Sequence, residues 1–186
     1  MLASTQPEAL LDKAITALTQ GGEWQSTLND LPVPVYTTDA EGRVTFWNRA
    51  CVDFAGREPE LGQDRWCVTW KLYSTTGEPI SHDTCPMAQA IKQRRAIREV
   101  IAIAERPDGS RVAFKPYPTP LFEADGSLKG AVNLLIDVTG EQPEALHEQA
   151  RHCRRLAQAI YDRDTSKALG DMADGFDKTA DELSAR

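Results

Sequence analysis

The sequence predicts an α+β protein: a five-stranded antiparallel sheet with helices on one face, preceded by an amphipathic helix and followed by a helical hairpin. Three observations lead to this fold class. Residues 128–138 form the most continuously apolar and β-branched run, as expected of a central strand covered on both faces. Asp125-Gly126, just before it, is typical of a tight hairpin turn, because glycine adopts positive φ without a clash. After Thr139 the composition shifts to Ala, Glu, Arg and Gln, which favour helices.

The composition is that of a globular protein. Of 186 residues, 41% are hydrophobic and 26% charged, and this length favours one substantial core. No segment approaches the roughly 20 apolar residues of a membrane span, and the first residues do not resemble a secretory signal, so we expect a cytoplasmic protein. The net charge of -7 argues against a nucleic-acid-binding surface. The four cysteines lack CxxC spacing, which fits reduced thiols better than disulfides.

Residues 1–23 are expected to form an N-terminal amphipathic helix outside the sheet domain. The segment Thr5-Gln6-Pro7-Glu8 has the pattern of a capping box with proline in the first turn, and apolar residues then recur at helical spacing. Gly21-Gly22 is expected to end this helix. A short second helix is predicted over residues 23–30, before two prolines interrupt the pattern.

The predicted sheet domain, residues 24–139, begins with a hairpin. Residues 33–39 and 43–47 are short β-rich runs joined by a turn that ends in glycine. Asn48 follows at once, and asparagine is a favoured N-cap because its side-chain oxygen accepts a hydrogen bond from a free helical N–H group. We therefore expect a helix over residues 49–55.

The middle of the domain has a less regular pattern. Residues 62–79 carry several aromatic side chains at weak periodicity and close in a turn. Asp83 or Thr84 is predicted to cap a further helix, which ends near Arg95.

Two more strands are predicted over residues 98–105 and 111–117, on either side of the turn 107–110. The second strand leads into a run that contains three prolines at alternate positions. Proline cannot donate a hydrogen bond to a sheet, so the strand must either bulge there or leave that edge unpaired. The prolines are Pro116, Pro118 and Pro120.

Several of these segments resemble a PAS domain of bacterial signalling proteins. The resemblance covers roughly residues 24–139 and rests on VPVYTTDAEGRVTFWNRA, RPDGSRVAF and LFEADGSLKGAVNLLIDVT, with the closing Asp137-Val138-Thr139. It implies a sensory or protein-interaction module. PAS folds hold haem, flavin, a small metabolite or no ligand at all, so the fold by itself does not define the function.

The resemblance also implies a ligand cavity between the sheet and its helices. Asn133 is the one polar side chain within an otherwise apolar strand, and a buried asparagine needs partners that either a ligand or a neighbouring strand can supply. The alternative is a core filled by side chains, without a cavity. The candidate lining residues are Val35, Phe46, Trp66, Trp70, Ile91, Val100, Phe114 and Asn133.

His82 and Cys85, with Cys67 upstream, form the second candidate site. They suggest a metal site or a thiolate activated by histidine, although zinc prefers four ligands and a nucleophilic cysteine needs an oriented base. The alternative is a packed cysteine beside a surface histidine. His82 is also the candidate haem ligand that the resemblance suggests. The sequence around Cys51 and Cys67 does not match the motif of flavin photosensors.

The C-terminal region, residues 140–186, is predicted to form two antiparallel helices, each with an apolar stripe. The stripes can pack on each other, on the outer face of the sheet or on a second subunit, and we expect a homodimer. His147, near the start of the first helix, is a candidate phosphoacceptor, with an exposed helical residue as the alternative. The residues of the predicted interaction seam are Leu146, Cys153, Ile160, Leu169, Met172 and Phe176.

Together these patterns predict a freestanding, non-catalytic PAS sensor or adaptor in bacterial signal transduction. A small ligand or a signalling protein partner would change how the flanking helices pack, and the signal would leave through them. No cofactor is required by the sequence; haem or a small metabolite are the candidates. The alternative function is a metal or redox protein that uses the Cys/His residues.

Overall fold

An antiparallel sheet of eight strands forms the centre of the protein, in the order β2-β1-β8-β6-β5-β3-β4, with β7 also paired to β8. The structure is a computed structural model that describes residues 7–139, 142–159 and 162–184. The strands are β1 (Val35–Asp39), β2 (Val44–Trp47), β3 (Lys71–Tyr73), β4 (Pro79–Ile80), β5 (Ala102–Glu105), β6 (Arg111–Pro116), β7 (Thr119–Phe122) and β8 (Leu128–Asp137).

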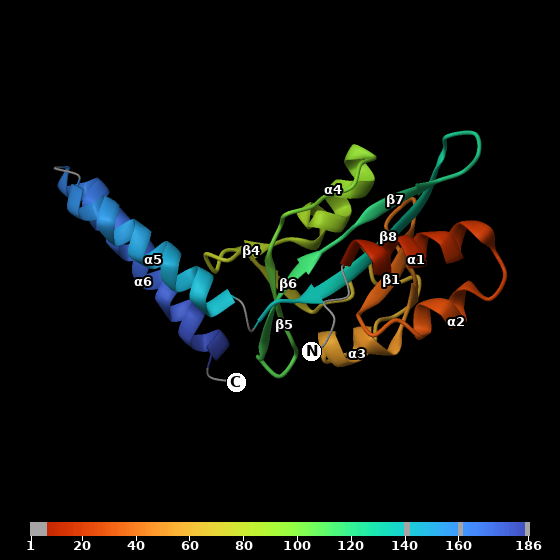
Figure 1. Ribbon diagram of the computed structural model, residues 1–186, viewed down its shortest axis with the longest axis horizontal. Coiled ribbons are helices and arrows are strands. Elements are labelled where there is room, and N and C mark those ends of the chain that lie inside the picture. Colours follow the sequence, from red (N-terminus) through yellow and green to blue (C-terminus); the bar gives the residue numbers. More distant parts are fainter. Residues whose placement is uncertain (1–6, 140–141, 160–161, 185–186) are drawn as a thin grey trace.

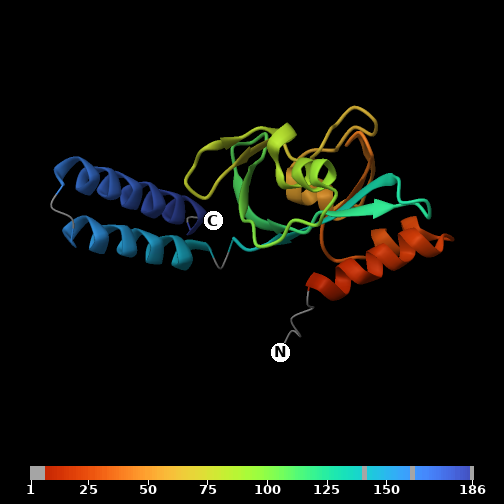
Figure 2. The same ribbon diagram turned by 90° about the horizontal axis from the view of Figure 1, so that it is seen from above.

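Helices lie on both sides of this sheet and beyond its end (Figures 1 and 2). The short helices α3 and α4 cover one face, which we call the concave face, and α1 and α2 lie against the opposite, outer face. The long helices α5 and α6 pair with each other and extend away from the sheet. Their bounds are α1 (Pro7–Gln20), α2 (Trp24–Asn29), α3 (Arg49–Ala55), the 3-10 turn η1 (His82–Thr84), α4 (Pro86–Gln93), α5 (Gln142–Ala159) and α6 (Arg163–Ser184).

The predicted α+β class is confirmed, whereas the number of strands was underestimated. Part of the difference comes from Pro118, which separates β6 from β7 although both keep one register against β8 as far as Leu121, after which the register shifts. The Tyr117 N–H donates to the Leu134 carbonyl oxygen at 2.9 Å. Because successive N–H groups point to opposite edges of a strand, Pro116, Pro118 and Pro120 all place their missing donor on the edge away from β8. No strand pairs with β7 on that edge within the described residues, although the Pro118 carbonyl accepts from the Ile97 N–H at 3.2 Å.

The side chain of Asn48 joins the N-terminal helices to the sheet. Its Oδ1 accepts hydrogen bonds from the N–H groups of Val35, at 3.1 Å, and Cys51, at 3.3 Å, so it caps α3 as predicted. Its Nδ2 donates to three carbonyl groups of the connection between α2 and β1, which belong to Leu28, Leu31 and Val33. Asn48 is fully buried. One side chain therefore satisfies backbone groups of α2, β1 and α3.

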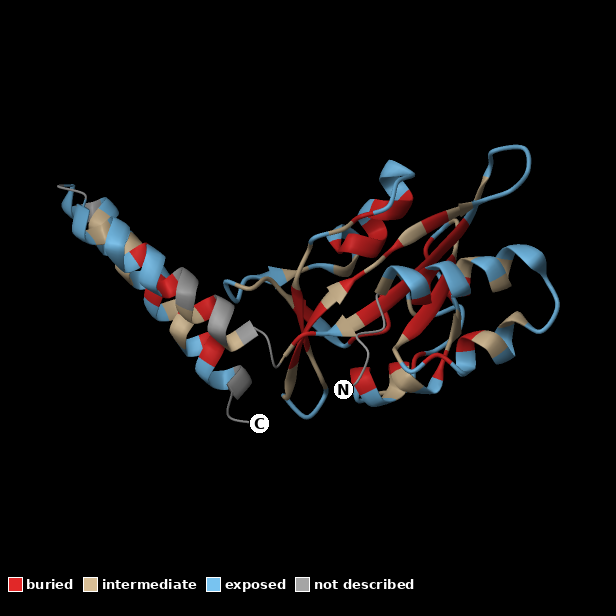
Figure 3. Cartoon of the chain, in the orientation of Figure 1, coloured by how far each residue is buried: buried red, intermediate tan, exposed pale blue. Residues whose placement is uncertain are grey.

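Three apolar clusters hold the elements together, and buried residues follow the strands and the helix faces turned toward them (Figure 3). The first lies between the concave face and helices α3 and α4. The second joins α1 and α2 to the outer face through β1 and β8. The third joins the base of the α5–α6 hairpin to Ile103 on β5, Ala113 on β6 and Val138. The two C-terminal helices thus pack both on each other and on the sheet.

The seam between α5 and α6 differs in part from the predicted one. Leu146, Cys153 and Phe176 are buried, Leu169 is half-buried, and Ile160 lies outside the described residues. Met172 is 49% exposed, because the next residue, Ala173, occupies the seam at 0% exposure. The α6 seam runs through Ala173, Phe176 and Ala180, a spacing of three and four that keeps one helix face toward α5.

We predict that Asn48→Asp lowers the free energy of unfolding by about 3 kcal/mol, because the carboxylate loses the donors to three carbonyl groups and places a negative charge in the core without a cationic partner. Asn48→Ser keeps the capping oxygen and should cost about 2 kcal/mol from the loss of the amide donors. Urea unfolding followed by circular dichroism measures both. Asn29→Asp on the exposed end of α2 is the control and should change stability by less than about 0.5 kcal/mol; equal effects at both positions would contradict the role of Asn48.

Candidate functional site

The concave face, where a cavity was expected, is occupied largely by core side chains that are at most 6% exposed. Of the eight predicted lining residues, Ile91 and Phe114 belong to this cluster and Trp66 packs against it. Asn133 is also buried on this face, between Ala131 and Leu135. The structure therefore brings together half of the predicted set.

The other predicted lining residues lie elsewhere. Val35 and Phe46 belong to the apolar cluster on the outer face, under α1 and α2. Strand alternation explains Val35, because its neighbour Tyr36 takes the concave side. A register shift between β1 and β2 accompanies the outward position of Phe46. Trp70 is 52% exposed, and Val100 is half-buried just before β5.

Asn133 obtains its hydrogen bonds from the protein itself. Its Nδ2 donates to the Tyr36 hydroxyl at 3.0 Å, and its Oδ1 accepts from the Tyr117 N–H at 2.9 Å. The Tyr36 hydroxyl in turn donates to the Trp66 carbonyl oxygen at 3.0 Å. Burial raises the pKa of Tyr36 well above its usual value, so the hydroxyl keeps its proton and remains a donor. Neighbouring protein groups, rather than a ligand, thus satisfy this asparagine.

Trp66 closes the core beside this network in an unusual backbone conformation, with φ +70°. Its ring packs so closely on the turn before β2 that a Cβ atom at Gly42 would overlap it. The guanidinium carbon of Arg65 lies 4.8 Å and Lys92 Nζ 5.5 Å from its ring centroid. Positive φ is unfavourable for a bulky residue. Two hydrogen bonds help to offset that cost: the Trp66 N–H donates to the Gly42 carbonyl at 2.7 Å, and the Trp66 carbonyl accepts from the Tyr36 hydroxyl.

Two polar groups on the concave side do not have such partners. The Thr38 hydroxyl and the Trp47 indole N–H are buried and form no hydrogen bond within the described part of the protein. The strand register places both side chains on the concave side, because Thr38 pairs with Ala131 and Trp47 pairs with Tyr36, and both partners face the concave cluster. A buried polar group without a partner is uncommon in a folded protein. The concave face therefore keeps two unused hydrogen-bonding groups, on β1 and β2.

The cysteines do not form a reactive site with His82. All four are free and buried. Burial raises the pKa of the Cys51 and Cys85 thiols to about 12 and also raises that of Cys67, so all three stay protonated near neutral pH. The sulfur atoms bond to a backbone carbonyl or to the Thr69 hydroxyl. Among the described residues, no three His, Cys, Asp or Glu side chains are grouped so that they could hold a metal ion.

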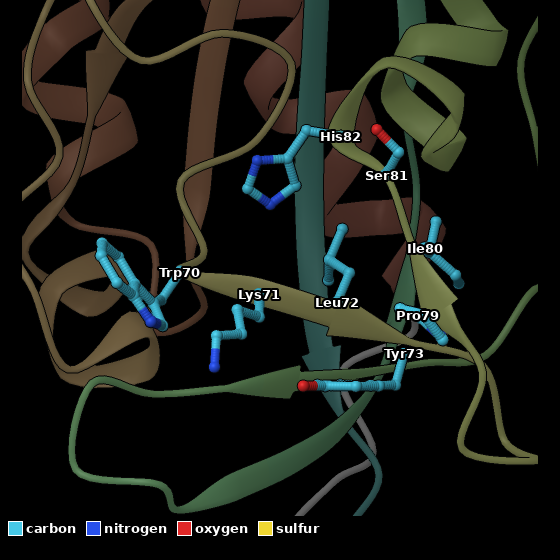
Figure 4. Close-up of a pocket in the computed structure, with 8 residues that line it drawn as sticks. All are labelled: Trp70, Lys71, Leu72, Tyr73, Pro79, Ile80, Ser81 and His82. Atoms are coloured by element: carbon cyan, nitrogen blue, oxygen red, sulfur yellow. The ribbon is translucent and has the colours of Figure 1, made fainter.

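His82 instead lines a pocket at the margin of the sheet, where β3 and β4 form a short hairpin (Figure 4). We call this the edge pocket. It has a volume of about 410 Å³ and brings Trp70 and His82 together. Figure 4 shows Leu72 pointing to the same side of β3 as His82, while Lys71 points to the other. The lining residues are Trp70, Lys71, Leu72, Tyr73, Pro79, Ile80, Ser81 and His82.

The edge pocket offers an aromatic surface and one imidazole. Burial lowers the pKa of His82, an effect that Asp64 opposes and Arg57 reinforces, so the ring is neutral near pH 7. Its Nε2 atom is buried without a hydrogen-bond partner in the described protein. The position of His82 at the sheet margin does not fit a ligand to haem held within the filled concave cluster. The weak periodicity of residues 62–79 gave no signal for this pocket.

His147 is held by carboxylates of α6. Its Nδ1 lies 2.7 Å from Asp177 Oδ1, and its Nε2 lies 3.8 Å from Asp181 Oδ1. Arg154 bonds the other oxygen of Asp177 at 2.6 Å and Asp174 at 2.8 Å. His147 and Arg154 lower the pKa of Asp177, which therefore stays ionised. Nearby negative charges disfavour a phosphorylated histidine, so this arrangement supports a structural role in the hairpin.

We predict that Tyr36→Phe lowers the free energy of unfolding by about 1 to 3 kcal/mol, because the Asn133 amide nitrogen loses its acceptor and the Trp66 carbonyl loses its hydroxyl donor in the core. Urea unfolding with tryptophan fluorescence measures the change. Tyr73→Phe, at the half-buried edge pocket, is the matched control and should cost less. An unchanged midpoint for Tyr36→Phe would show that the network does not stabilise the fold.

The family model described as PAS fold matches residues 28–143. No curated protein matches the chain. The chain is similar to the solved structure of a Rhodobacter sphaeroides LOV protein, with 11% identity, a TM-score of 0.46 and coverage of 97% of this chain and 99% of that one. It is also similar to a PAS domain from Colwellia psychrerythraea, with 14% identity, a TM-score of 0.44 and coverage of 62% and 94%.

A third similar structure is an RNA-binding light-oxygen-voltage receptor, with 18% identity and a TM-score of 0.48. The match covers 74% of this chain but only 36% of the receptor chain. The family model, by contrast, covers more than half of the present sequence. The chain therefore belongs to the PAS fold family.

Proposed function

We propose that this protein is a non-catalytic sensor or adaptor of signal transduction, in which a ligand or protein partner changes the packing of the flanking helices on the sheet. PAS domains are sensory modules, and the family membership supports the general role. The proposal includes a cytoplasmic location and a signalling protein as partner. No helix among the described residues is long and apolar enough to cross a membrane.

The observation that carries the proposal is the position of β8. On this strand, Ala131 and Leu135 face the concave cluster, while Val132 and Leu134 contact the N-terminal helices. One end of the same strand leads through Ile136 into the cluster under the α5–α6 hairpin. A shift of β8 caused by binding at one face would therefore alter the contacts of both pairs of helices. Such a ligand must bind the two packings with different affinity.

The unpaired Thr38 hydroxyl and Trp47 indole N–H favour a small ligand on the concave face. A small metabolite suits the limited space on the concave face better than haem does. His82, at the sheet margin, is also not placed to ligate a haem there. The burial and raised pKa of Cys67 and Cys85 weigh against the redox alternative.

The α5–α6 hairpin supports association of two copies. It extends away from the sheet (Figure 1), and two paired helices leave their outward faces uncovered. Leu156 is 40% and Met172 49% exposed on these helices. Burying such side chains between two hairpins would be favourable, so we propose a homodimer formed through this region.

We predict that a change on the concave side of β8 loosens the hairpin more than a comparable change elsewhere in the core. Leu135→Ala should increase amide hydrogen exchange in α5 and α6, because the cavity lets β8 shift beneath the third cluster. Ile91→Ala on α4 removes a side chain of similar size from the same cluster and serves as the control. Equal increases for both variants would indicate general destabilisation and would contradict a relay through β8.

We predict a mass of twice the 20.6 kDa chain in light scattering. The double variant Leu156→Glu and Met172→Glu should shift the protein to a monomer, because two carboxylates would be buried in the contact. Leu61→Glu, at a position 57% exposed outside the hairpin, is the control and should remain dimeric. A monomeric mass for the unaltered protein would overturn the homodimer.

A further inference from the structure

A second pocket lies on the outer side of the sheet, between the N-terminal helices and the strands. It has a volume of about 310 Å³ and is lined from α1, α2, β1, β2, β7 and β8. We call it the outer pocket. It lies on the outer side of the sheet, because Thr37 alternates with Tyr36, which faces the concave cluster. Thr38, Asp39 and Gly130, the next residues along the same strands, also line it. Its volume suits a small organic molecule.

One wall of the outer pocket is apolar. Leu18 of α1, Trp24 of α2 and Leu121 of β7 line it. The Trp24 ring packs edge-to-face on Phe46, with centroids 5.2 Å apart and an interplanar angle of 69°. This contact holds the indole in place, so the pocket offers a fixed flat surface to an aromatic or branched aliphatic group.

The strand residues of the lining offer hydroxyl donors. Thr37 Oγ1 and Thr45 Oγ1 lie 2.8 Å apart and share one hydrogen bond. One hydroxyl donates in that bond, so the other keeps its hydrogen for a further acceptor. Gly130 lines the same pocket, at a point where an added Cβ would overlap the Thr38 carbonyl oxygen. The absence of a side chain there allows β1 and β8 to run close together behind the hydroxyl groups.

The charges at the pocket favour an anion. Asp39 also lines it, but its carboxylate already accepts from the Arg43 N–H at 2.8 Å and the Arg43 guanidinium at 3.2 Å. Within the described part of the chain, the ion pair of Lys129 is a long one, 3.7 Å to Glu123, and both side chains are about half exposed. A weak exposed pair of this kind is readily exchanged for another partner. The ammonium group is therefore the charge best placed to bind a ligand.

We propose that the outer pocket binds a small monocarboxylate with an aromatic or branched aliphatic body. The body lies against Leu18 and Trp24, and the carboxylate accepts hydrogen bonds from Lys129 and a threonine hydroxyl. Such a ligand contacts both the N-terminal helices and the sheet, so it favours the docked position of α1 and α2. The effect of the ligand on the packing of α1 and α2 rests on the proposed sensor function, whereas the binding of the ligand does not.

Phenylacetate is the probe for this pocket, titrated into the full chain and followed by two-dimensional amide NMR. We expect shifts at Leu18, Trp24 and Thr45, with a dissociation constant on the order of 1 mM for a ligand of this size. Lys129→Gln should weaken binding about tenfold, because a charge-assisted hydrogen bond is lost. Lys178→Gln, an exposed change on α6, is the matched control and should leave binding unchanged. Leu18→Phe should block the pocket and abolish the shifts.

Two related probes test the ligand class. Phenylethylamine, which carries the opposite charge, should not bind, and 2-phenylethanol should bind more weakly than phenylacetate. Absence of shifts with phenylacetate, equal affinity in Lys129→Gln, or shifts confined to the concave face would each overturn the proposal. The dimer mass and the hairpin exchange are measured without phenylacetate. Failure of the sensor function is thus distinguishable from failure of this pocket.

Discussion

The hydrogen bonds of Asn48 are the constraint on which the arrangement of the N-terminal half depends. Its amide oxygen caps α3 and receives the first N–H of β1, and its amide nitrogen satisfies carbonyl groups that follow α2. Backbone groups buried without partners are costly. The Leu28 carbonyl also accepts from the Leu31 N–H at 3.3 Å, whereas the carbonyls of Leu31 and Val33 accept from Asn48. The position of α2 on the sheet, and with it the outer pocket, therefore depends on this residue.

β8 has a comparable role for the sheet. It pairs with β1, β6 and β7 and is buried over six consecutive residues. Because side chains alternate along a strand, its residues contribute to different apolar clusters in turn. A two-sided strand of this kind must be apolar almost throughout, and Asn133 is tolerated because Tyr36 and Tyr117 satisfy its amide. The clusters on the two faces are thus adjacent along one strand.

The sequence patterns predicted elements more accurately than they predicted which residues share a site. Asn48, the bounds of α3 and the apolar run of β8 were recognisable because capping, turn and burial signals are local. The predicted lining residues do not share one face, because Val35 and Phe46 face outward, and their direction depends on the register of β1 against its neighbours. β3 and β4 are only three and two residues long, too short to show alternation. The edge pocket lies within this short hairpin, whereas the outer pocket combines distant segments, and neither left a pattern in the sequence.

Burial or hydrogen bonds hold the cysteines, His82 and His147 in place. The buried thiols keep their protons, His82 is neutral and His147 is held among carboxylates. What these groups can do is change their packing and hydrogen bonds when a partner binds. A ligand on the concave face would act on Ala131 and Leu135, and one in the outer pocket on the contacts of α1 and α2 beside Val132 and Leu134. Since these residues lie within one five-residue stretch of β8, occupation of either face changes the strand that supports the other. The two faces are therefore expected to influence each other's affinity by the same factor, as linkage requires.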